Sequence, residues 1–181
     1  PAAALLPARA RRHSLHLGSA GAVYDRPYIN RRPVSHGAMN RVQSQYSLKR
    51  RVQFAETDMA GFVHFSCFFR FMEEAEHALW REAGLSIVPP EAGIGFPRLA
   101  TSFEYSRPLY FEDEFEVCIR IAQITDKTMR YTCELIRDGE KIGAGSLTMG
   151  CVRKVADEPI RMVSIPADIR DRFEVAPGLE E

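Results

Sequence analysis

Four consecutive segments after Pro97 alternate between apolar and polar residues, and this alternation restricts the possible folds more than any other feature of the chain. A period of two residues is typical of strands that bury one face. Short connections join the segments, and one of them contains Asp138-Gly139, a pair typical of a tight hairpin turn. The sequence therefore predicts an antiparallel sheet. The predicted strands cover 99–105, 115–121, 129–135 and 142–153, and the apolar face of the first consists of Leu99, Thr101, Phe103 and Tyr105.

A single helical pattern precedes these strands. Apolar residues recur at three- and four-residue steps from Phe68 to Ala83, which predicts an amphipathic helix of about four to five turns. Gly84 is typical of the position just after the end of a helix. The predicted polar face of the helix consists of Arg70, Glu73, Glu74, Glu76, His77 and Arg81.

The order of the elements predicts the fold class. A predicted strand from Tyr46 to Phe54 comes before the helix, with both of these residues on its apolar face. A short predicted helix near 165–174 closes the chain. We expect an α+β fold in which an antiparallel sheet of about five strands wraps around one long central helix. Small residues at 143–146 suit close packing of the helix on the sheet. Because the helix has only one sheet to pack on, we expect the sheet to pair with a second copy, giving at least a homodimer.

Residues 1–40 differ in composition from the rest of the chain, so we divide it into an N-terminal extension (1–40) and a folded domain (41–181). The extension is rich in Arg, Pro, Ala and Ser, contains almost no acidic residues and lacks periodicity. It fits a transit-like presequence, a flexible basic tail or a start assigned too early, since Met39 stands just before the first patterned segment. We favour the last interpretation and expect the extension to be disordered or non-native.

Charge and cysteine content exclude several classes of function. Residues 54–181 contain 14 Lys and Arg against 23 Asp and Glu, which argues against nucleic acid as a partner. No apolar run approaches the length of a membrane-spanning helix, so we expect no membrane partner. The four cysteines lie in apolar or alternating segments without CxxC spacing, which favours buried thiols in a reducing compartment. We therefore expect a cytoplasmic protein.

The loop between the first strand and the helix contains the main candidates for chemistry. Asp58 and Glu56 precede the helix start, where carboxylates also interact favourably with the helix dipole without any catalytic role. Free backbone N–H groups between Phe65 and Cys67 would form a site that polarises a carbonyl group. A carboxylate beside such a site could act as a nucleophile or as a general base for water. We expect Gly61 to allow close approach of the backbone.

Other candidates are weaker. His64 lies in an apolar stretch and fits a packing residue, while Cys67 fits a buried thiol better than a nucleophile. His77 has helical spacing from two glutamates, but no third ligand accompanies them, so we expect no metal site. The glycine-rich motifs that bind nucleotides are not present in the sequence.

Several of these segments resemble the 4-hydroxybenzoyl-CoA thioesterase family of hot-dog-fold proteins. The resemblance covers roughly residues 46–174 and is carried mainly by the run VQFAETDMAGFVHFSCFFRFMEEAEHALWREAGL, in which a D-x-x-G-x-V motif precedes an aromatic helix start. Weaker matches follow in the right order: the Arg107-Pro108 strand end, FEDEFEV, TDKTMRYTCEL and IPADIRDRF.

The resemblance implies an acyl-CoA thioesterase that forms dimers and often tetramers. The catalytic Asp of the family motif matches Asp58, the motif glycine matches Gly61, and the N–H that polarises the thioester carbonyl matches Phe65. His64 matches a position with varied, mostly aromatic residues and is counted among the expected substrate-binding residues, and Lys127 resembles a contact to the CoA phosphates. The expected acyl pocket is lined by Phe62, Phe65, Phe68 and residues near Thr101.

The activity that the resemblance implies is hydrolysis of a small or medium acyl- or aryl-CoA to the free acid and CoA. No cofactor is expected, because CoA is part of the substrate. The alternative is a non-catalytic acyl-CoA-binding module of the same fold. The acyl group, and the choice between CoA and an acyl carrier protein, stay open.

Overall fold

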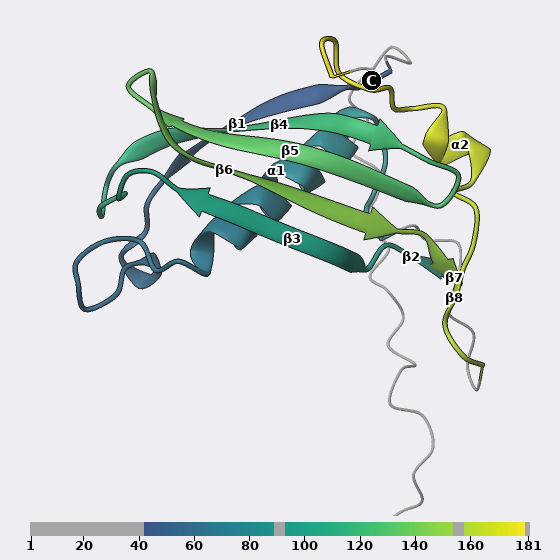
Figure 1. Cartoon of the computed structure of the whole chain (residues 1–181), viewed down its shortest axis with the longest axis horizontal. Helices are drawn as coiled ribbons and strands as arrows, with labels where there is room; N and C mark the ends of the chain where they lie inside the picture. The colour runs from purple at the N-terminus through teal and green to yellow at the C-terminus, as the bar shows by residue number, and fades with distance from the viewer. Residues whose placement is uncertain (1–41, 89–92, 154–157, 180–181) are drawn as a thin grey trace, which may run out of the picture. The chain divides into compact units, whose positions relative to one another are not determined.

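The computed structural model describes residues 42–88, 93–153 and 158–179, so the extension predicted for 1–40 lies outside the described residues. Five strands form one antiparallel sheet in the order β1-β4-β5-β6-β3, and one main helix packs against it (Figure 1). This architecture confirms the predicted sheet and the predicted order of strand, helix and four strands. In chain order the elements are β1 (Gln45–Arg51), the 3-10 helix η1 (Phe54–Glu56), α1 (Cys67–Glu82), β2 (Ile94–Gly95), β3 (Arg98–Tyr105), β4 (Glu114–Ile124), β5 (Thr128–Arg137), β6 (Glu140–Gly150), β7 (Val152–Arg153), β8 (Arg161–Met162) and α2 (Ala167–Arg170).

Helix α1 has 16 residues and packs against β1, β4 and β3. Its apolar stripe is buried as predicted, and the core extends to Trp80, whose indole Nε1 donates to the Tyr131 hydroxyl at 3.1 Å. At Gly145 an added Cβ would lie 2.4 Å from the Ser102 carbonyl oxygen of β3 and 2.9 Å from the Met72 sulfur of α1. Glycine is therefore required at this position mainly by the neighbouring strand, and only in part by the helix as we expected.

Glu76 contradicts the predicted polar face of the helix. Its side chain is fully buried and forms an ion pair with Arg98 of β3. The arginine lies far away in the sequence, so helical periodicity alone places Glu76 on the wrong face.

Three predicted strands differ from the structure, one in where it ends, one in which residues share a face and one in being divided in two. β1 ends at Arg51, because the chain turns into η1, and Phe54 is 76% exposed instead of lying on the apolar face. Leu99 does not share a face with Thr101, because a β-bulge between Arg98 and Ala100 shifts the register. The last predicted strand is divided at Cys151, after which β7 joins β2 and β8 in a separate three-stranded sheet. The two-residue strands of that sheet are too short to produce a periodic signal.

None of the helices in the described ranges is long and apolar enough to cross a membrane.

Candidate active site

Local hydrogen bonds fix the loop that carries Asp58. The Asp58 carboxylate accepts the Ala60 backbone N–H at 2.8 Å, and the Asp58 carbonyl accepts the Gly61 N–H at 3.0 Å. Gly61 has a φ of +84°, in the left-handed region that favours glycine. An added Cβ at Gly61 would meet no described atom of the chain within 4 Å, so packing within the chain does not require glycine here. Glycine is needed here for the turn itself.

We expected the backbone N–H groups from Phe65 to Cys67 to lack acceptors, but in the described ranges this holds for only one of the three. The Cys67 N–H donates to the His64 carbonyl at 2.9 Å, and the Ser66 N–H lies 3.4 Å from His64 Nδ1. The Phe65 N–H has no acceptor within the described ranges. The free donor is therefore at the position that the family resemblance implies.

Asp58 and Phe65 line the same open pocket of about 360 Å³. Two more residues of the predicted acyl pocket, Phe62 and Phe68, also line it. The Tyr105 hydroxyl donates to the Phe65 carbonyl at 3.1 Å, and its ring packs edge-on against Phe68. The remaining lining residues are Val63, Ser106, Arg107 and Pro108. Asp58, Phe65 and three other aromatic residues thus line one pocket.

Sequence reasoning did not identify the wall formed by residues 105–108 as part of the site. These residues lie about forty positions after Phe65, and no local pattern connects the two segments. The available signal was Arg107-Pro108, which marks the end of a strand and the start of a loop. Loops at strand ends are common places for binding residues.

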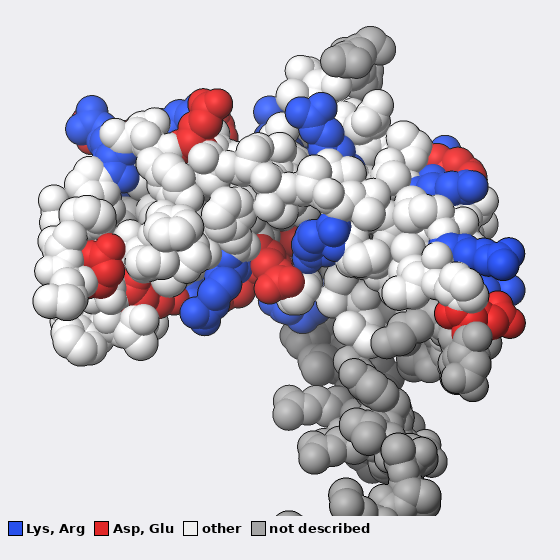
Figure 2. Space-filling view, turned by 60° about the horizontal axis from the view of Figure 1, so that its bottom comes forward, with Lys and Arg blue, Asp and Glu red and all other residues white. Residues whose placement is uncertain are grey.

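Exposed apolar side chains surround the pocket. At the end of the domain that carries the Asp58 loop, at the left of Figure 1, Figure 2 shows uncharged surface between several acidic and basic side chains. Exposed apolar groups of this kind are typical of ligand or partner surfaces. The exposed residues here are Phe54, Met59, Phe62, Phe65, Tyr105, Tyr110 and Phe111.

Three predicted binding residues do not line this pocket. His64 lies beside it, with its Nδ1 2.8 Å from the Ser66 hydroxyl and its ring against Phe65. Thr101 is exposed in the middle of β3. Lys127 is in the β4–β5 turn, at the far end of β4 from the Asp58 loop (Figure 1). At about 3.3 Å per residue, the length of β4 separates them by about 30 Å, so Lys127 cannot reach the pocket of its own chain.

The Glu56 carboxylate and the Cys67 thiol are both engaged in contacts within the protein, so neither is free to act as a nucleophile or base. Glu56 is buried, and its carboxylate pairs with Arg50 at 2.8 Å. Burial opposes the ionised form, but hydrogen bonds from Arg50 and from the Gln53 N–H outweigh it, so the pKa of Glu56 is lowered. Burial raises the pKa of the Cys67 thiol, which donates to the Glu56 carbonyl at 3.6 Å. Cys67 is therefore a buried thiol, as predicted, and Arg50 is a partner that the sequence did not reveal.

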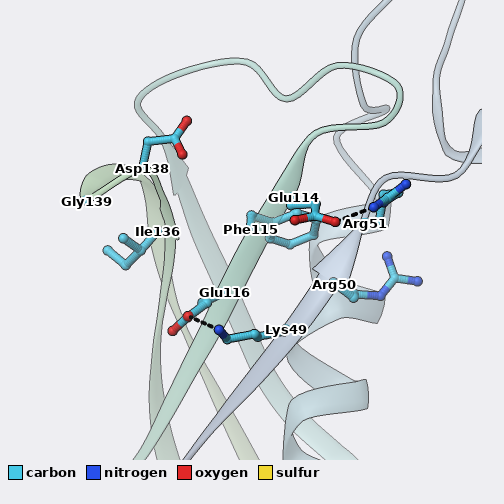
Figure 3. Close-up of a pocket in the computed structure, with 9 residues that line it drawn as sticks. All are labelled: Lys49, Arg50, Arg51, Glu114, Phe115, Glu116, Ile136, Asp138 and Gly139. Atoms are coloured by element: carbon cyan, nitrogen blue, oxygen red, sulfur yellow. Dashed lines mark hydrogen bonds and ion pairs between the residues drawn. The ribbon is translucent and has the colours of Figure 1, made fainter.

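A second, larger groove of about 610 Å³ is separate from the Asp58 pocket (Figure 3). Its charged side chains mostly pair with one another: Lys49 with Glu116 at 3.5 Å, and Arg51 with Glu114. These pairs leave little uncompensated charge for a ligand, so the groove does not compete with the Asp58 pocket as the candidate active site.

Within the described ranges, no group of three or more His, Cys, Asp and Glu side chains is placed to hold a metal ion. The lack of a metal site remains a prediction.

Comparisons with known proteins identify the family of this chain. A relative from Aquifex aeolicus, provisionally named an esterase, is 30% identical over 122 residues, which cover 67% of this chain and 91% of the relative. The 1,4-dihydroxy-2-naphthoyl-CoA hydrolase of Prochlorococcus marinus is 28% identical over 109 residues, which cover 55% of this chain and 70% of the relative. The structure of a gentisyl-coenzyme A thioesterase matches with a TM-score of 0.62 at 26% identity, covering 71% of this chain and all of that one.

The family model described as "Thioesterase-like superfamily" matches residues 52–173. This range includes the Asp58 loop, α1 and the four following strands of the main sheet. The chain belongs to the thioesterase-like superfamily of hot-dog proteins.

Proposed function

We propose that the protein hydrolyses an acyl-CoA thioester to the free acid and CoA, with Asp58 as the catalytic carboxylate. The predicted reaction class, thioester hydrolysis, is confirmed by the family and by relatives named for that reaction. Membership of the narrower 4-hydroxybenzoyl-CoA thioesterase family, and the role of Asp58, are part of the proposal. A single observation carries it: Asp58 and Phe65, whose N–H has no acceptor in the described ranges, line one aromatic pocket.

The residues support the following reaction. The thioester carbonyl oxygen accepts the Phe65 N–H, which the dipole of α1 strengthens, so the carbonyl carbon becomes more electrophilic. Asp58 either attacks that carbon directly or removes a proton from a water molecule that attacks it. The tetrahedral oxyanion then collapses, the C–S bond breaks and CoA leaves as the thiolate. In the direct route, water hydrolyses the mixed anhydride and releases Asp58.

The pocket favours a compact, flat acyl group. Its walls include Phe62, Phe65, Phe68 and Tyr105, and aromatic rings stack well on one another. The relatives named for 1,4-dihydroxy-2-naphthoyl-CoA and gentisyl-CoA act on aryl thioesters. We therefore place aryl-CoA first among the acyl groups, with short and medium aliphatic CoA esters next.

We further propose that the active form is a homodimer or a homotetramer. β3 is an edge strand of the five-stranded sheet, and Leu99 and Thr101 on it are exposed. An exposed edge is a ready site for pairing with another chain. In such an assembly Lys127 could contact a CoA phosphate bound to a partner's pocket. Sedimentation velocity would test the assembly, and a monomer at assay concentration would contradict it. Cytoplasmic localisation and the lack of a cofactor remain predictions.

The experiment that tests the function measures CoA release with a thiol reagent from a panel of aryl- and alkyl-CoA esters. We expect hydrolysis by the native protein and a loss of at least about a hundredfold in kcat for Asp58→Asn with the fold intact. Binding of CoA esters without any release of CoA would instead support the alternative, a non-catalytic acyl-CoA-binding module.

A further inference from the structure

We propose that Arg50 is a positioning residue for thioester hydrolysis: it holds Glu56, and through Glu56 it fixes the Asp58 loop against the start of α1. The inference rests on the proposed function, because the position of Asp58 affects a rate only if Asp58 takes part in the reaction.

Arg50 lies on the inner face of β1. Its two neighbours, Lys49 and Arg51, are exposed and pair with glutamates of β4, as the dashed lines in Figure 3 show, whereas Arg50 has no partner among the residues drawn there. The Arg50 side chain is only 16% exposed, and its guanidinium lies over the Phe71 ring at 4.3 Å from the centroid. A cation that is stacked and mostly buried is held in one orientation.

The guanidinium connects three elements. Its Nη1 and Nη2 donate to the two carboxylate oxygens of Glu56 at 3.1 and 2.8 Å, a bidentate pair. Its Nε donates to Glu74 of α1 at 2.5 Å. Arg50 on β1 is thereby connected to the end of η1 and to the helix at the same time.

Glu56 transmits this restraint to both reactive groups. Asp58 follows it by two residues in the sequence. The Glu56 carbonyl accepts the His64 N–H at 2.9 Å and the Cys67 thiol at 3.6 Å, and these two residues flank Phe65. Through these bonds Glu56 restrains the chain on both sides of the segment from Asp58 to Phe65.

Arg50 itself does not line the Asp58 pocket; it lines the separate groove of Figure 3. An acyl group in the Asp58 pocket is therefore not in contact with Arg50, and we expect an effect of Arg50 on kcat to act through the loop. Without the guanidinium, the buried Glu56 carboxylate would lose its counter-charge and would either take up a proton or move toward water.

The test uses the full chain and the CoA ester of the panel that the native protein hydrolyses fastest. We expect Arg50→Gln to lower kcat by about ten- to a hundredfold while KM changes by less than about threefold, since small displacements of a catalytic group act mainly on the chemical step. Arg50→Lys should recover part of the lost kcat, because it keeps the charge but not the bidentate geometry. Arg51→Gln, a neighbouring exposed arginine of the same strand, is the matched control and should retain the native kcat.

The double variant Arg50→Gln with Asp58→Asn separates positioning from general stabilisation. If Arg50 acts through Asp58, this variant should have the same residual rate as Asp58→Asn alone within about twofold. The proposal is overturned if folded Arg50→Gln keeps the native kcat, or if it lowers the rate by the same factor with and without Asp58. Should Arg50→Gln not fold, the same comparison is made with Arg50→Lys. A native protein that releases no CoA from any ester would refute the proposed function, and with it this inference.

Discussion

Burial of Glu76 should make the stability of the domain fall as the pH rises from 5 to 8. The side chain is fully buried on α1, and its Oε1 has no hydrogen-bond partner in the described part of the chain. Burial raises the pKa of Glu76 from 4.5 to about 7; the nearby Arg98 favours the ionised form but does not outweigh burial. The folded state therefore binds a proton more tightly than the unfolded state does.

The sign and size of the effect follow from proton linkage. Because the pKa is higher in the folded state, the contribution of Glu76 to stability is fully present below pH 4.5 and is lost as the pH rises to about 7. At about 1.4 kcal/mol per unit of pKa, the loss between pH 5 and pH 8 is about 2 to 3 kcal/mol. Burial lowers the pKa of His77 below its ordinary value, which gives a dependence of the opposite sign, in which stability rises with pH. A comparison between variants is therefore needed.

Glu76→Gln keeps the shape of the side chain and cannot ionise. We expect the difference in unfolding free energy, Glu76→Gln minus native, to increase by about 2 to 3 kcal/mol between pH 5 and pH 8. His77 is present in both proteins, so its contribution cancels. The measurement is urea unfolding followed by circular dichroism at half-unit steps of pH. A difference that does not change with pH would refute the reasoning, because it would mean that Glu76 ionises equally well in both states.

Three other substitutions test separate features. Gly145→Ala should destabilise the domain by about 3 kcal/mol in the same urea assay, because the Ser102 backbone that the new Cβ meets cannot move aside; a loss under about 1 kcal/mol would show that the backbone of β3 can shift away. Gly61→Ala should cost about 1 to 2 kcal/mol through its left-handed φ and should lower kcat, since the turn positions Asp58; an unchanged kcat in steady-state kinetics would contradict that link. Arg107→Gln should raise KM for CoA esters several-fold and weaken the salt dependence of kcat/KM, because it removes a cation from the pocket whose exposed ion pair with Glu140, at 3.0 Å, is weak. Equal salt dependence in both proteins would exclude this electrostatic role.

The sheet and the main helix could be predicted because each has one buried face with a simple period. β4 is the clearest example: Phe115, Val117, Ile119 and Ile121 are all buried, in strict alternation. Asp58 and Phe65 could be proposed because they lie in one short loop with a recognisable motif.

What the sequence did not reveal depends on partners that lie far away along the chain. Arg50 interrupts the apolar face of β1 and is buried only because Glu56 and Glu74 neutralise it. Glu76 occupies a core position because Arg98 approaches from β3. The periodicity of a sequence shows which residues are polar, but not which of them form ion pairs with residues far away. It therefore places Glu76 on the solvent-exposed face of the helix and says nothing about Arg50.

The contact between Trp80 and Tyr131 has a practical consequence. The chain contains a single tryptophan, and in the structure its side chain is fully buried between the rings of Phe96 and Phe173, with its N–H on the Tyr131 hydroxyl. Intrinsic fluorescence excited at the indole band therefore comes from one site, where the C-terminal half of α1 meets the sheet and the segment after α2. The native emission should be blue-shifted and protected from acrylamide, and it reports the docking of that helix without any added label.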